Sequence, residues 1–267
     1  MTVDNKGVSL PSERLVLFMD ILGFRNLIAR MSKEPDLYSH VRDALKTMQR
    51  VVRDNYKKGM AGKLFPGEDS QLVPHMIQFS DCIVISYPLH FPALCASLII
   101  LNAQELATQL LYEGVLTRGG IACGWTYHDE SVLLGAGVIA AYELESQVAD
   151  VPRIVLADEV VSFLTNEQFY IRQDLEKDSD GCWIIKPFSG LRGVLLPQQI
   201  RDDEKFRDKL IQAFTWTRAY ILQQLDQIKG KGPNLLAKYR WLANQFNIAA
   251  KEAFQDMNIS VETIRIP

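Results

Sequence analysis

The sequence predicts a mixed-sheet α/β (α+β) protein whose sheet is flanked by helices and followed by a C-terminal helical hairpin. The apolar run 15–24 is typical of a buried strand that turns at Gly23 into a helix. Two apolar segments, 73–79 and 82–87, flank a short turn and predict a β-hairpin. A hairpin within an α/β order makes the sheet mixed rather than wholly parallel. Beyond residue 200, apolar residues recur at helical spacing.

The first elements follow from the same patterns. Residues 14–20 are short and apolar and predict a buried strand, and 24–31 predict a helix. Asp36 is a suitable N-cap for a second, amphipathic helix. Residues 57–70 are polar and glycine-containing and predict a loop, whereas 91–112 predict a well-buried helix.

Short strands and helices alternate in the second half of the core, and adjacent glycines in the first of these strands indicate a bulge or a close approach. The expected order is strand 115–124, loop 125–131, strand 132–135, helix 137–147, strand 152–156, helix 159–164 and strand 182–185. We expect a core domain over 1–200 and a helical extension over 201–267, with helices at 204–228 and 234–254.

The composition is that of an ordinary globular protein. The 267 residues are 48% hydrophobic and 23% charged, with a net charge of −3. This balance gives no reason to expect the basic surface that nucleic-acid binding usually needs, so we expect no nucleic-acid partner, although a local basic pocket for a phosphorylated ligand is possible. The four cysteines are scattered and form no C-x-x-C pair, which indicates free thiols in a reducing compartment.

The sequence shows no pattern typical of a signal segment or a membrane span. Residues 1–13 lack an apolar signal core, and the longest apolar run, 93–101, is far shorter than the roughly 20 residues of a membrane span. We therefore expect a cytoplasmic protein with no membrane partner.

Two lone aspartates mark the candidate site. Asp20 ends the first apolar run, and Asp81 interrupts the hairpin. On adjacent strands two such carboxylates can face each other and bind a divalent metal through oxygen. Phe18 shares a strand face with Asp20 because side chains alternate along a strand. Alternatively, each aspartate is only a turn residue at the end of a strand.

Four motifs resemble those of the class III nucleotidyl cyclases. They are, in the order of that family, Phe18-Met19-Asp20-Ile21-Leu22-Gly23-Phe24, Ser80-Asp81-Cys82, Arg118-Gly119-Gly120-Ile121 and a glycine-led helix ending in Glu145-Ser146. The resemblance covers residues 14–160. It implies a mixed sheet, a head-to-tail homodimer with composite sites, and two divalent ions, Mn²⁺ or Mg²⁺, bound by Asp20, Asp81 and the carbonyl of Ile21.

Departures from the family pattern concern the purine base and the transition state. Ile77 and Leu133 replace the polar residues that read a purine in this family, and Ile139 and Glu143 replace the usual asparagine and arginine. A purine would leave its polar edge unpaired against such walls, which can cause severe rejection.

This variant pattern resembles the bacterial pyrimidine cyclases of Pycsar antiphage defence. The segments that carry the resemblance are Ala141-Tyr142-Glu143-Leu144-Glu145 and, later in the chain, Tyr239-Arg240-Trp241-Leu242-Ala243. That resemblance implies cyclisation of UTP or CTP to a cyclic monophosphate that activates a downstream effector. UTP is favoured because no residue near Ile77 offers an acceptor for the amino group of cytosine.

Further residues complete the expected site. Arg118 is the first candidate to replace the missing arginine, and Lys186 is a weaker candidate for the triphosphate. Gly23 and Phe24 expose backbone N–H groups at a helix N-terminus, which suits an anion. Phe18 could line the sugar or base pocket, and Ile77 and Phe79 could form its wall.

Simpler interpretations remain open for several of these residues. Arg118 could only pair with a carboxylate at the core edge, and Lys186 could be an exposed lysine. Ile77 and Phe79 could be core residues. Glu143 and Glu145 are expected on a solvated or interface face of their helix.

Three functions fit the sequence. The first is a uridylate or cytidylate cyclase, and the second is an inactive cyclase-like domain that binds a nucleotide or a partner. The third is a cyclic-dinucleotide synthase, ranked last because its G-G-(D/E)-E-F hairpin is absent and Phe79-Ser80-Asp81 offers one acid.

Overall fold

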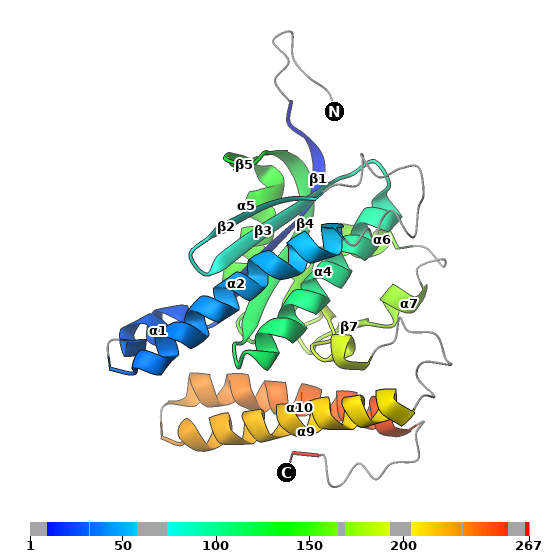
Figure 1. Cartoon of the computed structure of the whole chain (residues 1–267). Helices are drawn as coiled ribbons and strands as arrows, with labels where there is room; N and C mark the ends of the chain where they lie inside the picture. The colour runs from blue at the N-terminus through cyan, green and yellow to red at the C-terminus, as the bar shows by residue number, and fades with distance from the viewer. Residues whose placement is uncertain are drawn as a thin grey trace. The chain divides into compact units, whose positions relative to one another are not determined.

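A computed structural model describes residues 10–31, 33–57, 74–164, 169–192, 204–230, 232–255 and 265–266 (Figure 1). The contacts divide the chain into two compact units, 1–185 and 186–267. The predicted loop lies outside the described residues from position 58 onward.

An eight-stranded mixed sheet forms the first unit, which confirms the predicted fold class. The strand order is β2-β3-β1-β4-β6-β8-β7, and β5 pairs with β4. Every pairing is antiparallel except that of β4 with β6. The strands are β1 (Ser12–Ile21), β2 (His75–Phe79), β3 (Cys82–Pro88), β4 (Thr117–His128), β5 (Leu133–Gly135), β6 (Ile154–Leu156), β7 (Leu175–Lys177) and β8 (Trp183–Ile185).

Helices cover both faces of the sheet. They are α1 (Phe24–Met31), α2 (Pro35–Lys57), α4 (Pro92–Tyr112), α5 (Ala136–Glu143), the π-helical turn η2 (Leu144–Val148), α6 (Asp158–Ser162) and α7 (Phe169–Arg172). Leu15, Leu17 and Met19 of β1 belong to the main core with residues of α2 and α4, which cross one face in Figure 1. Val16 and Phe18 pack with α5 on the other face, as strand alternation requires.

Helix α4 is the most apolar element. It is long and apolar enough to cross a membrane, yet 67% of its apolar window is buried inside the protein. Its Cys95, Ile99 and Ala103 are fully buried in the main core. Packing beneath the sheet therefore accounts for its hydropathy.

Two long helices dominate the second unit, as the sequence predicts. They are α9 (Glu204–Gln227) and α10 (Pro233–Gln255), preceded by the 3₁₀ turn η4 (Ser189–Arg192). Phe214 of α9 lies 5.5 Å from Phe246 and 5.0 Å from Phe254 of α10, measured between ring centroids. These buried rings join the hairpin.

Several local expectations are wrong. β4 continues through 125–128, which were expected to be a loop, because these residues pair with β1 and β5. The three-residue strand β7 was missed. Helix α2 begins at Pro35, so Asp36 lies in its first turn rather than at its cap. The helix expected over 137–147 ends as a π-helical turn.

Candidate active site

Asp20 and Arg118 form a cross-strand pair at the end of β1. The antiparallel register of β1 and β4 places the two residues directly opposite each other. The Nε and Nη2 atoms of Arg118 donate to the two carboxylate oxygens of Asp20 at 3.2 and 3.3 Å. Both side chains are largely buried. Arg118 therefore pairs with a carboxylate at the core edge, and that carboxylate is Asp20.

Glu145 reaches the same guanidinium from η2. Its Oε1 atom lies 2.7 Å from Nε of Arg118, and its side chain is 2% exposed. Oε1 accepts no hydrogen bond within the described chain, so the contact is an ion pair without a directed bond. The expectation of a solvated or interface position is wrong for Glu145, whereas Glu143 is exposed.

Gly120 allows this approach. A Cβ atom at Gly120 would lie 2.2 Å from the Ala141 carbonyl oxygen and 2.9 Å from the Glu145 backbone nitrogen. The helix therefore packs directly on the backbone of β4. This packing brings Glu145 to Arg118, two residues before Gly120 and on the same sheet face.

Asp81 lies beside these residues in a two-residue hairpin turn. Phe79 pairs with Cys82, and Ser80 between them has a φ of 55°. The β1–β3 register ends with Met19 opposite Ile83, so the next opposing positions are Asp20 with Cys82. Ile21 and Asp81 follow. The three expected metal ligands thus occur at one end of two adjacent strands.

The electrostatic shifts reflect this crowding. Burial raises the pKa of the Cys82 thiol to about 11, with additional contributions from Asp81, Asp20 and Glu145. Burial, followed by the negative charge of Asp20, raises the pKa of Glu145 to about 7. We call Asp20, Asp81 and Glu145 the carboxylate cluster. Arg118 is its basic partner.

The donor set suits a hard divalent cation because all donors are oxygen. Two of the three carboxylates contact the one guanidinium, so additional positive charge would stabilise the cluster. Within the described ranges, however, no three His, Cys, Asp or Glu residues are already arranged to hold a metal ion. Asp20 would have to exchange Arg118 for the ion. The residues fit a metal chemically but are not assembled around one.

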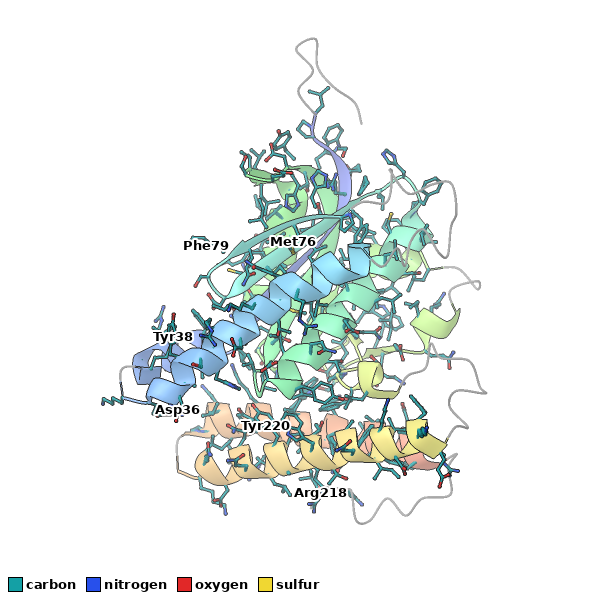
Figure 2. All side chains as sticks on the ribbon, viewed as in Figure 1. Asp36, Tyr38, Met76, Phe79, Arg218 and Tyr220 are labelled. Carbon is teal, nitrogen blue, oxygen red and sulfur yellow. The ribbon has the colours of Figure 1, made fainter. Side chains whose placement is uncertain are left out.

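Aromatic and apolar residues lie on the same sheet face as Asp20. The rings of Phe18 and Tyr142 meet edge to face, 5.4 Å apart between centroids. Ile77 of β2 is half-buried, while Phe79 is 78% exposed at the hairpin tip (Figure 2). Phe79 is therefore not a core residue. Sequence reasoning missed the ring contact of Tyr142.

Two expected ligands of the nucleotide have other neighbours. Gly23 has a φ of 80° and directly precedes α1, but the Phe24 side chain packs against the main core, on the opposite sheet face from Asp20. Lys186 begins the second unit, where its Nζ is 3.3 Å from Oε1 of Glu252. Within the first unit, the Phe24 side chain is therefore not brought to the carboxylate cluster.

No family model and no curated protein matches the sequence. Among solved structures, the chain is similar to a bacterial light-regulated adenylyl cyclase at 15% identity and a TM-score of 0.40, over 58% of this chain and 80% of that one. It is similar to a guanylyl cyclase at 15% identity and a TM-score of 0.38, over 70% and 94%.

A third similar structure is a class III adenylyl cyclase-like ATP-binding protein from Pseudomonas aeruginosa, at 14% identity and a TM-score of 0.38, over 64% of this chain and 38% of that one. At these levels the side chains of the site, rather than the similarity, decide what the chain can do.

Proposed function

We propose that the protein is a nucleotidyl cyclase that converts UTP, or with lower preference CTP, to its 3′,5′-cyclic monophosphate and pyrophosphate. The observation that carries the proposal is the meeting of Asp20, Ile21 and Asp81 at one end of β1 and β3. The motif resemblance supplies the reaction class. The residues of the carboxylate cluster supply the chemistry.

The nucleophile is the ribose 3′-hydroxyl of the substrate itself, so the protein mainly positions groups and stabilises charge. Two bound Mg²⁺ or Mn²⁺ ions would lower the pKa of that hydroxyl and neutralise the phosphates. Asp20, Asp81 and the Ile21 carbonyl would hold the ions. Asp81 makes no hydrogen bond or ion pair in the described structure and is half-exposed, which leaves its carboxylate available.

Arg118 changes partner in this proposal. Its guanidinium contacts Asp20 and Glu145 together. When Asp20 binds an ion, Glu145 keeps Arg118 at the site. The guanidinium can then donate to the α-phosphate, where negative charge develops. A second role for Glu145 as proton acceptor is not needed.

We assign selection of the nucleotide base to the apolar side chains of Ile77 and Phe79. Ile77 and Phe79 share the sheet face of Asp20, because Phe79 pairs with Cys82 and Ile77 with Val84. Neither side chain can hydrogen-bond to a purine edge. A pyrimidine has the smaller ring and a shorter polar edge to leave unpaired, so these walls favour UTP and CTP.

The homodimer is supported by exposed apolar side chains on α5. Ile139 is 59% and Tyr142 49% exposed, and the two lie one turn apart on the helix. Such exposed apolar side chains suit an interaction surface. A second protomer there would complete each site. The antiphage role and the downstream effector belong to the same proposal and depend on the Pycsar resemblance.

The test incubates the full chain with ATP, GTP, CTP and UTP separately in Mn²⁺ and separates the products by mass spectrometry. We expect cyclic UMP, at a rate reduced at least about 10²-fold in Asp81→Asn. Asp208→Asn, an exposed aspartate of α9, is the matched control. A purine cyclic product would contradict the assignment of Ile77 to an apolar wall that disfavours purines.

A second candidate function is a nucleotide-binding domain without cyclase activity. The Arg118–Asp20 pair favours it, because this pair occupies one of the expected metal ligands. Binding of a labelled triphosphate with no cyclic product from any of the four nucleotides would support this alternative.

A further inference from the structure

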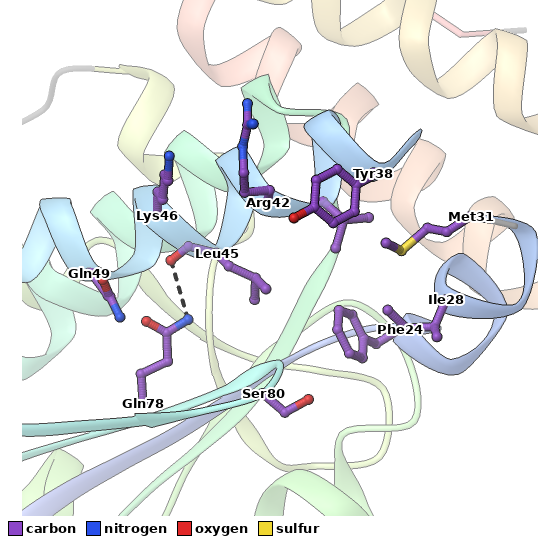
Figure 3. Close-up of a pocket in the computed structure, with 11 residues that line it drawn as sticks. Phe24, Ile28, Met31, Tyr38, Arg42, Leu45, Lys46, Gln49, Gln78 and Ser80 are labelled. Atoms are coloured by element: carbon purple, nitrogen blue, oxygen red, sulfur yellow. Dashed lines mark hydrogen bonds between the residues drawn. The ribbon is translucent and has the colours of Figure 1, made fainter. Parts of the chain in front are cut away.

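We propose that a pocket on the other side of the hairpin, between α1, α2 and β2, binds a small amphipathic anion that carries a hydrogen-bond donor. The pocket has a volume of about 430 Å³ (Figure 3), within the range of small-molecule sites. It lies on the face opposite Asp20, since Leu45 and Phe24 pack against the main core. It is therefore distinct from the carboxylate cluster.

The floor of the pocket is apolar. Phe24, Ile28 and Met31 of α1 face Leu45 of α2 across it (Figure 3). Ile28 remains 44% exposed although it lies beside this floor. A flat aromatic or aliphatic body would cover these side chains and remove apolar surface from water.

A positive charge lies at the rim. Arg42 and Lys46 lie one helical turn apart on α2, and both line the pocket. Arg42 is already paired with Asp43 at 2.9 Å. Lys46 forms no ion pair within the described part of the chain; its charge acts on the Asp43 carboxylate, which is already bound to Arg42. An anionic group on the ligand would supply the missing partner, and the apolar floor would exclude water from one side of the pair.

Gln78 supplies a hydrogen-bond acceptor. Its Nε2 atom donates to the Leu45 carbonyl at 3.2 Å, as Figure 3 shows. Its Oε1 atom is buried and has no partner. A buried acceptor without a partner is destabilising, so a ligand N–H or O–H that reaches Oε1 would be bound preferentially. The pocket therefore defines a ligand class: an apolar body that carries an anionic group and a hydrogen-bond donor.

Occupancy of the pocket would bear on the proposed active site, and this step rests on the proposed function. Ser80 lines the pocket and precedes Asp81 in a turn that has a left-handed φ. Phe24 lines it and directly follows Gly23 at the start of α1. A ligand in contact with Ser80 and Phe24 would restrict both turns that carry the expected metal ligands.

The probe for the test is 1-anilinonaphthalene-8-sulfonate, which has aromatic rings, one N–H and one sulfonate. Titration calorimetry and fluorescence on the folded full chain should give one saturable site. Lys46→Ala should weaken binding about fivefold, and Gln78→Met should weaken it as well. Lys209→Ala, at an exposed lysine of α9, should leave it unchanged. Ile28→Trp, at an exposed position, should block the site.

N-phenyl-1-naphthylamine has the same rings and N–H but no sulfonate, so Lys46→Ala should not affect its binding. Non-saturable binding, or equal affinity of the sulfonate probe for wild type and Lys46→Ala, would overturn the pocket assignment. Hydrogen exchange over residues 78–82 should slow when the probe binds. Unchanged exchange there would overturn the coupling to Asp81 alone, whether or not the protein cyclises a nucleotide.

Discussion

The Oε1 atom of Glu145 lies 2.7 Å from Nε of Arg118, and the same guanidinium contacts Asp20 at 3.2 Å. One arginine thus joins a strand-end carboxylate to a buried carboxylate on a π-helical turn. Such turns occur frequently at functional sites. Because Arg118 makes both contacts, it keeps Glu145 as a partner when another cation binds Asp20.

Arg118 and a divalent ion compete for Asp20 in this account. Arg118→Met removes the competitor, so we expect Mn²⁺ to bind about tenfold more tightly in the absence of nucleotide. The same variant should cyclise UTP much more slowly because the guanidinium is lost. Electron paramagnetic resonance of free Mn²⁺ measures the affinity. Weaker Mn²⁺ binding in Arg118→Met than in wild type would contradict the competition for Asp20. Arg153→Met cannot serve as the control because Arg153 is itself buried and ion-paired.

Gly120 is expected to tolerate no side chain. In Gly120→Ala the new Cβ meets the Ala141 carbonyl oxygen and η2 must move, so we expect a loss of about 3 kcal/mol or more in unfolding free energy. Gly181→Ala is the comparison, because its Cβ meets nothing within 4 Å and only its φ of 85° is unfavourable. Denaturant unfolding measures both. A smaller loss at Gly120 than at Gly181 would show that the helix is not seated on β4.

His128 should make the protein acid-sensitive. It is 5% exposed, and burial, followed by the charges of His75 and Arg14, lowers its pKa to about 3. Because the unfolded state binds a proton near pH 6.5 and the folded state does not, stability is lost as the pH falls below 6.5. Between pH 7.5 and 5.0 we expect wild type to lose about 2 kcal/mol more than His128→Asn.

Denaturant titrations at the two pH values give this difference. His75, whose pKa is also lowered by burial, remains in both proteins and contributes in the same direction. An equal pH dependence in wild type and His128→Asn would mean that His128 titrates normally in the folded protein.

The exposed patch on α5 predicts a dimer contact. Ile139→Asp should shift the chain toward a monomer in light scattering at micromolar concentration, because a charge replaces an apolar contact. Leu235→Asp, on the partly exposed face of α10, should leave the association state unchanged. A wild-type chain that is monomeric, or a dimer that is insensitive to Ile139→Asp, would exclude this surface as the contact.

The sequence predicted the large elements well because their patterns are long and local. Helix α1 was predicted with its observed bounds, and α4 and the C-terminal hairpin within a few residues. β7 was missed because three residues between turns give no periodicity. The extension of β4 through 125–128 was missed because pairing with β1 and β5, rather than local preference, keeps these residues in a strand.

Part of the geometry around Asp20 follows from the sequence pattern. The register of β1 and β3 brings Asp20 and Asp81 to one end of the sheet, as two strand tips suggested. The burial of Glu145 could not be read from its polar neighbours, since it depends on the missing Cβ of Gly120. One signal was available: Glu145 follows the small, buried Ala141 by four residues, which places both on one helix face. The orientation of Phe24 depends on tertiary packing against α2.

The most direct measurement is a crystal structure of the protein with Mn²⁺ and a UTP analogue that cannot cyclise. The account predicts anomalous density for Mn²⁺ between the Asp20 and Asp81 carboxylates, with Arg118 bound to Glu145 and to the phosphate. Density for the analogue without Mn²⁺ at these aspartates, and with Arg118 still paired to Asp20, would contradict it.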